Sequence, residues 1–284
     1  LPIDNEIKNK LLKGKNVLAI HVANTAGGAW LDAGIVKEAK NITSKLLQQA
    51  EQKKVTIDAT QTTYNFTCGA TDLELTFTSP LLIKNPDLLA RPVSYVSVKV
   101  KSNDGAAHST SLYLGASTAL AVNNNSQTVV ANGYTAGQLN ILKAGTKEQP
   151  VLQKKGDDLR IDWGYMYVVI PAKDRAVQYI TPVKSAFNAF LNDTYRANTG
   201  SIEGTQLMLN SVIPLGSVGN EIVNKIVMIG YDDLYSIQYF GQNLLPWWKD
   251  GKNTTIEKEL SKAFTDYGPV IIKCKEWNTK LYND

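Results

Sequence analysis

The residue types best suited to chemistry gather in one acidic stretch near the middle of the chain. Asp157, Asp158 and Asp162 lie close together, with Arg160 and Trp163 beside them. Carboxylates that flank an arginine could bind an amide or a polyol, hold Ca²⁺ through oxygen ligands, or act as a general acid and base where burial separates their pKa values. Alternatively, the aspartates cap a turn and Arg160 neutralises Asp158 or Asp162 inside a sandwich. The sequence favours this structural role.

A second polar group follows an apolar run later in the chain. Asp232 and Asp233 precede Tyr235 and Gln238. Carboxylates, phenols and amides together can line a sugar or amino-acid pocket, because each desolvated hydroxyl or amide of a ligand needs a partner. The same group could instead form the polar seam between a sandwich and a helical domain. The interface is favoured, since the segment runs into a Pro-Trp-Trp sequence and then a predicted helix.

Tryptophans offer a further kind of contact. Trp247 and Trp248 stand side by side in the sequence. Their rings could stack on a sugar, as could those of Trp30 and Trp163, or they could pack at a domain junction. Sugar binding predicts exposed rings beside Asp and Asn in a groove, whereas an interface predicts rings that are buried or covered.

Composition excludes several classes of function. The chain has 284 residues and a formal net charge of +4, which is too weak and too evenly spread for the basic stripe that nucleic-acid binding requires. Two histidines and two cysteines are too few for a His-rich metal site, a disulfide framework or an arguable Ser-His-Asp arrangement. No stretch approaches the ~20 apolar residues that cross a bilayer. The sequence therefore predicts no nucleic-acid partner, no metal, no cofactor and no membrane span, and it identifies no catalytic residue.

The elements that position these side chains are mostly strands. Apolar and polar residues alternate over several short segments, as in half-buried strands, and Asn- and Gly-containing turn signals separate them. The predicted strands are 60–68, 73–78, 93–100, 111–116, 127–131, 139–142, 165–170, 206–213 and 225–238. Many short strands without long helices between them favour a mainly β fold, a large antiparallel β-sandwich of the supersandwich kind with a few short helices.

Helical segments are predicted before, between and after these strands. Residues 36–52 and 184–191 favour helices, the first because it is rich in Ala, Lys, Leu and Gln and has no Gly or Pro. Thr254 or Thr255 can cap a helix with acidic residues in its first turn, and a further helix is expected over 270–281. The chain thus ends in a truncated helical segment, which we expect to begin a larger helical domain.

Four stretches of the sequence resemble the N-terminal β domain of the glutaminase A family, in the same order along the chain. They are TFTSPLL at 76–82, DLLARPVSY at 87–95, KKGDDLRIDWGY at 154–165 and GYDDLYSIQYFGQ at 230–242. The resemblance covers the chain from about residue 55 onward. It implies an exported protein, periplasmic or extracellular, in which a β-sandwich precedes an α-helical toroid. In the full protein it implies hydrolysis of glutamine to glutamate and ammonia.

The start of the chain is similar to something else. Residues 12–21, together with 24, 27–29 and 32–34, resemble the closing strands of a galactose-binding-like jelly roll. The expected organisation is therefore a jelly-roll remnant at 1–36, an antiparallel β-sandwich of glutaminase A type at 37–253 and the start of an α-helical toroid at 254–284.

These resemblances predict a non-catalytic N-terminal region of a glutaminase A-like hydrolase. Its expected partners are the C-terminal helical domain of the same polypeptide and a small amide or sugar ligand. The alternative is a carbohydrate-binding or glycoside-hydrolase accessory module, because a sandwich joined to a helical toroid is also common among glycoside hydrolases. A scaffold without any ligand is the third possibility.

Overall fold

A computed structural model describes residues 9, 10, 13, 47–156, 159–197, 200–249 and 251–283. The chain divides into two compact units, Leu1–Leu47 and Gln48–Asp284. The predicted jelly-roll remnant at 1–36 lies outside the described residues except for residues 9, 10 and 13, and so does Trp30. Asp157 and Asp158 of the acidic stretch also lie outside them. The second unit contains the nine-stranded, the three-stranded and the two-stranded sheet.

A nine-stranded sheet forms the frame of this unit, and all of its neighbouring strands are antiparallel. Its order is β1-β2-β3-β4-β12-β8-β7-β6-β10. In that order the bounds are Glu51–Ile57, Gln61–Cys68, Thr71–Thr78, Val93–Ser102, Val223–Asp232, Tyr165–Pro171, Leu139–Thr146, Val129–Ala136 and Ile202–Gly204.

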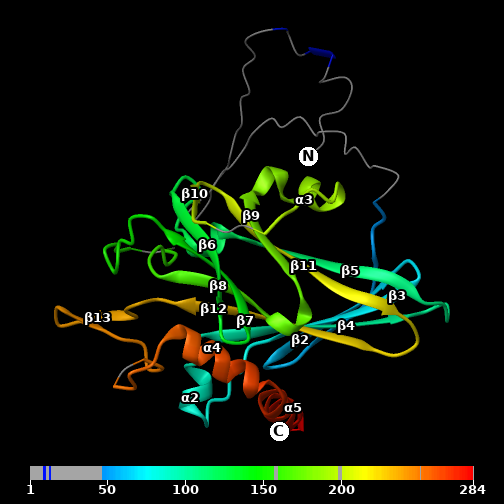
Figure 1. The fold of residues 1–284 in the computed structure, drawn as a ribbon. Coiled ribbons are helices and arrows are strands. Elements are labelled where there is room, and N and C mark those ends of the chain that lie inside the picture. Colours follow the sequence, from blue (N-terminus) through cyan, green and yellow to red (C-terminus); the bar gives the residue numbers. More distant parts are fainter. Residues whose placement is uncertain are drawn as a thin grey trace. The chain divides into compact units, whose positions relative to one another are not determined.

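A second sheet packs on one face of the first. It has three strands in the order β5 (His108–Ser117), β11 (Leu207–Val218) and β9 (Val177–Pro182), drawn above the large sheet in Figure 1. Met166, Val168 and Ile170 of β8 share a buried cluster with Leu209 and Ile213 of β11. The prediction of a mainly β fold built as a large antiparallel β-sandwich is confirmed.

Two helices cover the opposite face of the large sheet, below it in Figure 1. They are α4 (Ile256–Thr265) and α5 (Tyr267–Asn283). Tyr167 and Val169 of β8 lie in one buried cluster with Leu260 of α4. Because alternate residues of a strand point to opposite faces, β8 is buried on both sides, which explains its uninterrupted apolar sequence.

The start of α4 follows from its cap. Of the two predicted candidates, Thr255 is the N-cap: its Oγ1 accepts from the Lys258 backbone N–H at 3.4 Å. Glu257 and Glu259 lie in the first turn, where negative charge is favourable. The Tyr95 hydroxyl of β4 donates to the Ala263 carbonyl at 3.0 Å and ties the helix to the sheet.

The shorter helices and strands are where the structure differs from the sequence prediction. The other helices in the described part of the second unit are α2 (Pro86–Leu89), α3 (Val183–Leu191) and the single 3-10 turns η1 (Thr118–Ala121) and η2 (Ala172–Asp174). The strand predicted over 225–238 ends at residue 232, after which β13 (Ile237–Tyr239) and β14 (Gln242–Leu244) form a separate hairpin. The reason is local, because Leu234 has a φ of 58° and breaks the extended backbone.

Two other sequence predictions need correction. The helix expected over 36–52 does not reach its predicted end, because residues 51 and 52 already belong to β1, where they pair with β2. The short strands β9 and β10 were not predicted, since neither carries a long alternating pattern. In β1 the pairing with β2 overrides the local helix preference.

Candidate functional site

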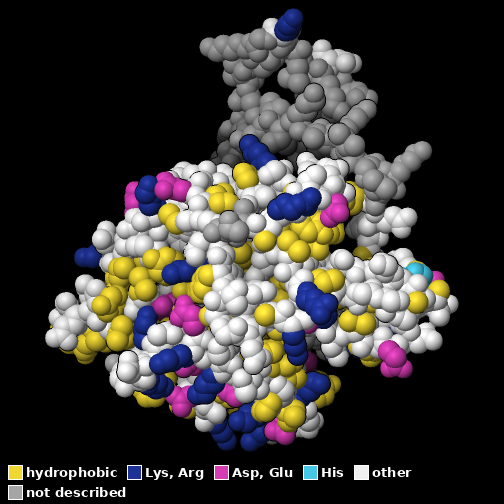
Figure 2. Space-filling model, viewed as in Figure 1, with side chains coloured by type: hydrophobic (Ala, Val, Ile, Leu, Met, Phe, Trp, Pro, Cys, Tyr) yellow, Lys and Arg dark blue, Asp and Glu magenta, His cyan; other side chains and the backbone are white. Residues whose placement is uncertain are grey.

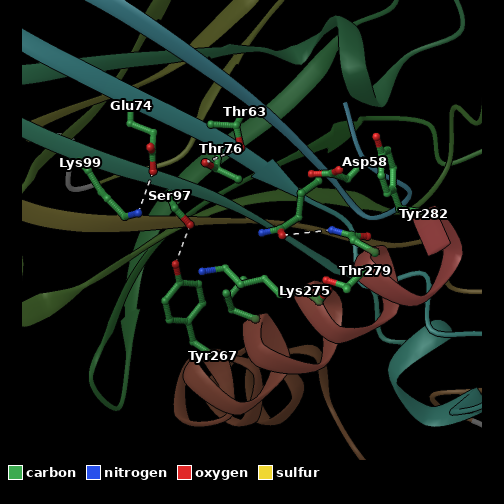
Figure 3. Close-up of a pocket in the computed structure, with 13 residues that line it drawn as sticks. Asp58, Thr63, Glu74, Thr76, Ser97, Lys99, Tyr267, Lys275, Thr279 and Tyr282 are labelled. Atoms are coloured by element: carbon green, nitrogen blue, oxygen red, sulfur yellow. Dashed lines mark hydrogen bonds and ion pairs between the residues drawn. The ribbon is translucent and has the colours of Figure 1, made fainter. Parts of the chain in front are cut away.

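A cleft of about 700 Å³ lies between strands β2–β4 and helix α5, and we call it the α5 cleft (Figure 3). Its sheet wall consists of cross-strand rows of polar side chains. Thr63, Thr76 and Ser97 lie opposite one another on neighbouring strands, and Glu74 lies opposite Lys99 one row along. The Thr63 and Thr76 hydroxyls are 3.1 Å apart, and Lys99 Nζ donates to Glu74 Oε1 at 2.7 Å.

The helix wall is attached to the sheet at both ends of the cleft. Near the start of α5, the Tyr267 hydroxyl lies 2.6 Å from Ser97 Oγ. Near its end, Asn278 Oδ1 accepts from the Thr60 backbone N–H at 3.0 Å and from Thr60 Oγ1 at 2.8 Å. Lys275 lines the cleft between these two attachments. The side-chain hydrogen bonds therefore keep the helix at a fixed distance from the strands.

The charges in the cleft are only partly matched. The hydrogen bond from Lys99 is the main cause of the lowered pKa of Glu74, with burial acting against it and the charge of Lys275 adding to it. Lys275 and Asp58 also line the cleft, and neither of them forms an ion pair with any described residue. No histidine or cysteine stands among the described residues that line the cleft. Hydroxyls, amides and single charges of this kind suit the binding of a polar ligand.

The sequence did not reveal the α5 cleft. Its walls come from β2–β4 and from the last helix, far apart in the chain, and no short motif joins them. The available signal was the alternation in β3, where Glu74 and Thr76 stand between Leu73, Leu75 and Phe77. That pattern shows which face of the strand is polar but not what lies opposite it.

One carboxylate of the predicted acidic stretch is buried in an ion pair. The Asp162 side chain is 0% exposed and forms an ion pair with Lys154 Nζ. Arg160 is exposed, and its backbone N–H donates to Asn123 Oδ1 at 3.1 Å. The partner of Asp162 is therefore Lys154, and not Arg160 as the structural alternative expected.

The second predicted group is divided by burial. Asp232 is buried, and both of its carboxylate oxygens accept from Lys249 Nζ at 3.1 Å. Asp233 is half-buried and accepts from Ser236 Oγ at 2.6 Å. Asp233 lines a pocket of about 320 Å³, and Asp232 is not among the described residues that line it.

The remaining polar candidates connect loops. The Trp163 indole donates to the Tyr235 carbonyl at 3.0 Å, and the Tyr231 hydroxyl donates to the Trp163 carbonyl at 2.8 Å. Gln238 lies on the exposed β13–β14 hairpin, where its Nε2 donates to Asn243 Oδ1 at 3.2 Å. The structure thus brings Trp163 and Tyr235 together and leaves Gln238 apart from them.

The two neighbouring tryptophans differ in their exposure to solvent. Trp248 is 4% exposed and packs in the cluster between sheet and helices, whereas Trp247 is 59% exposed. Trp247 Nε1 donates to Asp87 Oδ1 at 3.2 Å, and Lys252 Nζ lies 5.0 Å from its ring centroid. Both tryptophans line a pocket of about 320 Å³, which we call the Trp247 pocket. Its polar lining includes Asp233.

The surface beside this pocket is apolar. On the β13–β14 hairpin, Ile237, Tyr239 and Phe240 are exposed, Phe240 by 89%. Figure 2 shows hydrophobic side chains gathered at the left, where β13 lies in Figure 1, and basic and acidic side chains interspersed over the rest of this face. Exposed apolar patches often mark contact surfaces, and a contact with a helical domain remains a prediction for this segment.

The described residues contain no group of three or more His, Cys, Asp or Glu placed to hold a metal ion. In that same part of the chain, no helix is long and apolar enough to cross a bilayer.

Similarity to solved structures is low. A human-microbiome protein assigned as a kojibiose phosphorylase matches with a TM-score of 0.36 and 12% identity, over 78% of this chain and 23% of its own. The heparan sulfate lyase HepC of Pedobacter heparinus matches with a TM-score of 0.34 and 10% identity, over 66% and 22%. An Escherichia coli K12 protein assigned as an aldose 1-epimerase gives 0.33 and 9%, over 66% and 69%. The chain spans less than a quarter of the first two structures, and likeness at this level assigns no function.

The comparison with protein families corrects the resemblance drawn from the sequence. No curated protein sequence matches the chain. The family model that matches is DUF5127, described as a domain of unknown function, over residues 60–284. The glutaminase A assignment is therefore wrong, and the location and reaction it implied lose their basis. Two of the acidic residues in the stretches that suggested it, Asp162 and Asp232, are held in buried ion pairs. The chain belongs to the DUF5127 family.

Proposed function

We propose that this chain is a non-catalytic carbohydrate-binding module that acts as an accessory to a glycoside-processing enzyme. The observation that carries the proposal is the position of Trp247, whose exposed ring lines a pocket beside Asp233 and Ser236. Sugar binding predicts an exposed ring beside Asp and Asn, and the pocket has the exposed indole and the Asp, with the Ser236 hydroxyl as a further polar group.

The ring of Trp247 is held in place before any ligand arrives. Its indole N–H is bound to Asp87, and Lys252 occupies a position over the ring. Because the ammonium lies over one face of the indole, the apolar face of a sugar would stack on the opposite face. A fixed ring loses less conformational entropy on binding than a mobile one.

The polar side of the pocket suits hydroxyl groups. Asp233 accepts a hydrogen bond from Ser236 through Oδ2, and its carboxylate has further acceptor capacity for a sugar hydroxyl. Asp232, next in sequence, is engaged by Lys249 and does not line the pocket. The pocket therefore offers one carboxylate among its described lining residues, while glycoside hydrolysis ordinarily uses two. This supports binding without cleavage.

The experiment is affinity electrophoresis of the full chain through gels that contain soluble polysaccharides, with a reducing-end assay on the same panel. We expect retardation by at least one glycan, loss of retardation in Trp247→Ala and no release of reducing ends. Phe240→Ala is the matched control, because it removes an exposed aromatic ring that does not line the pocket.

Either of two results would overturn the proposal: no retardation by any member of the panel, or equal retardation of Trp247→Ala and the unmodified chain. Release of reducing ends by the chain alone would refute the non-catalytic role.

A further inference from the structure

We infer that the α5 cleft is a second binding site, for a polyol that carries one carboxylate, such as a hexuronate. It shares no lining residue with the Trp247 pocket, so the two sites can be tested separately. Its volume of about 700 Å³ lies within the usual range for small-molecule sites, roughly 300–1,000 Å³.

Lys275 supplies the position for the carboxylate. In Figure 3 its side chain points from α5 toward the strands, near Tyr267 and the Glu74–Lys99 pair. Glu74 already accepts from Lys99 at 2.7 Å, so the nearest acidic group of the wall has its own cation. A ligand carboxylate at Lys275 would form the direct ion pair that this ammonium does not make with any described residue.

The sheet wall supplies partners for hydroxyl groups. One of the Thr63 and Thr76 hydroxyls donates to the other, and this hydrogen bond uses one of their two O–H groups. The pair therefore keeps one O–H donor and several acceptor positions for a ligand. At the other end of the cleft drawn in Figure 3, Asp58 has no ion-pair partner among the described residues and can accept from ligand hydroxyls. The cleft therefore favours a ligand with an anionic end and a hydroxyl-rich end.

Other ligand classes fit less well. A phosphate dianion would meet one unpaired ammonium among the described lining residues, and Asp58 and Glu74 of the same cleft would repel its two charges more strongly than the single charge of a carboxylate. A neutral sugar would leave the Lys275 ammonium without a charged partner. The described lining contains no arginine, the residue that usually recognises phosphate through two hydrogen bonds.

The test is isothermal titration calorimetry of the full chain with a hexuronate disaccharide and with the corresponding neutral hexose disaccharide. We expect the hexuronate to bind at least ten-fold more tightly, and Lys275→Gln to weaken it roughly ten- to hundred-fold, as expected for a lost hydrogen bond to a charged group. Lys273→Gln is the control, because it makes the same charge change on α5 but lies outside the cleft. Both lysines are exposed, and thermal melts would show that both variants fold.

Three results would overturn the inference: no hexuronate binding at millimolar concentration, equal affinity for the neutral disaccharide, or equal effects of Lys275→Gln and Lys273→Gln. Trp247→Ala separates this site from the proposed function. We expect that variant to bind the hexuronate normally, so a failure at one site leaves the result at the other readable.

Discussion

Replacing Lys154 with Met tests whether the predicted acidic stretch is structural. The Asp162 carboxylate is fully buried, and its Oδ2 accepts from Lys154 Nζ and from Gln127 Nε2, the latter at 2.8 Å. Its Oδ1 has no hydrogen-bond partner among the described residues. In Lys154→Met, a buried charge keeps one neutral donor and loses its cation.

The size of the effect follows from this burial. Removing one partner of a buried ion pair costs about 3–5 kcal/mol, because the remaining charge is left uncompensated. The Lys154 side chain is 33% exposed, so water can replace part of the ammonium and the lower end of that range applies. A loss of about 3 kcal/mol corresponds to a fall of about 6–12 °C in Tm for a unit of this size.

Urea unfolding and thermal melts, followed by circular dichroism, would measure the loss. Lys155→Met is the matched control: it removes a neighbouring exposed lysine and should change stability by less than about 0.5 kcal/mol. The double variant Lys154→Met, Asp162→Asn should recover about half of the loss or more, because it removes the buried charge as well. If Lys154→Met is no worse than Lys155→Met, or if the double variant recovers nothing, Lys154 does not stabilise Asp162 and the structural interpretation fails.

Three further perturbations probe the packing and the cleft. Leu260→Ala, at a fully buried position of α4, should cost about 2–5 kcal/mol in urea unfolding, and a smaller loss would argue against tight helix–sheet packing. Gly164 has a φ of +78°, and a Cβ at this position would overlap the Asp232 carbonyl. Gly164→Ala should therefore lower the free energy of unfolding by about 1–3 kcal/mol more than Gly137→Ala, because Gly137 has a φ of +58° and open space around it. Equal Tm values for the two variants in thermal melts would contradict this. Because the pKa of Glu74 is lowered from its ordinary 4.5, its contribution to stability is present above that pH and is lost as the pH falls through the lowered value. Lys99→Met should therefore lose stability relative to the unmodified chain at pH 6, and this difference should shrink as the pH is lowered below 4.5. A difference that does not change with pH over this range would refute the assignment.

Much of the sheet could be predicted because its patterns are local. Val96, Val98 and Val100 alternate along β4 and all point into buried clusters, as the sequence predicts. The apolar run in β8 and the Thr255 cap of α4 are also readable from neighbouring residues. β9 and β10 escape prediction because they are short and depend on pairing with distant strands.

The candidate sites depend on contacts between distant residues, and these the sequence does not contain. Trp247 and Trp248 lie together in a turn, and nothing in the local sequence tells which of the two is exposed. The local sequence likewise does not tell that Lys154, and not Arg160, is the partner of Asp162. The α5 cleft exists only because the last helix lies across three strands.

The double burial of β8 makes the large sheet a wall shared by two hydrophobic cores. Stripping α4 and α5 from the sheet would uncover Tyr167, Val169 and Met228 on a broad apolar surface. A version of the protein shortened before Ile256 would keep all the strands but would expose this apolar face, and we expect it to aggregate. The two helices therefore shield the apolar face of the large sheet from water.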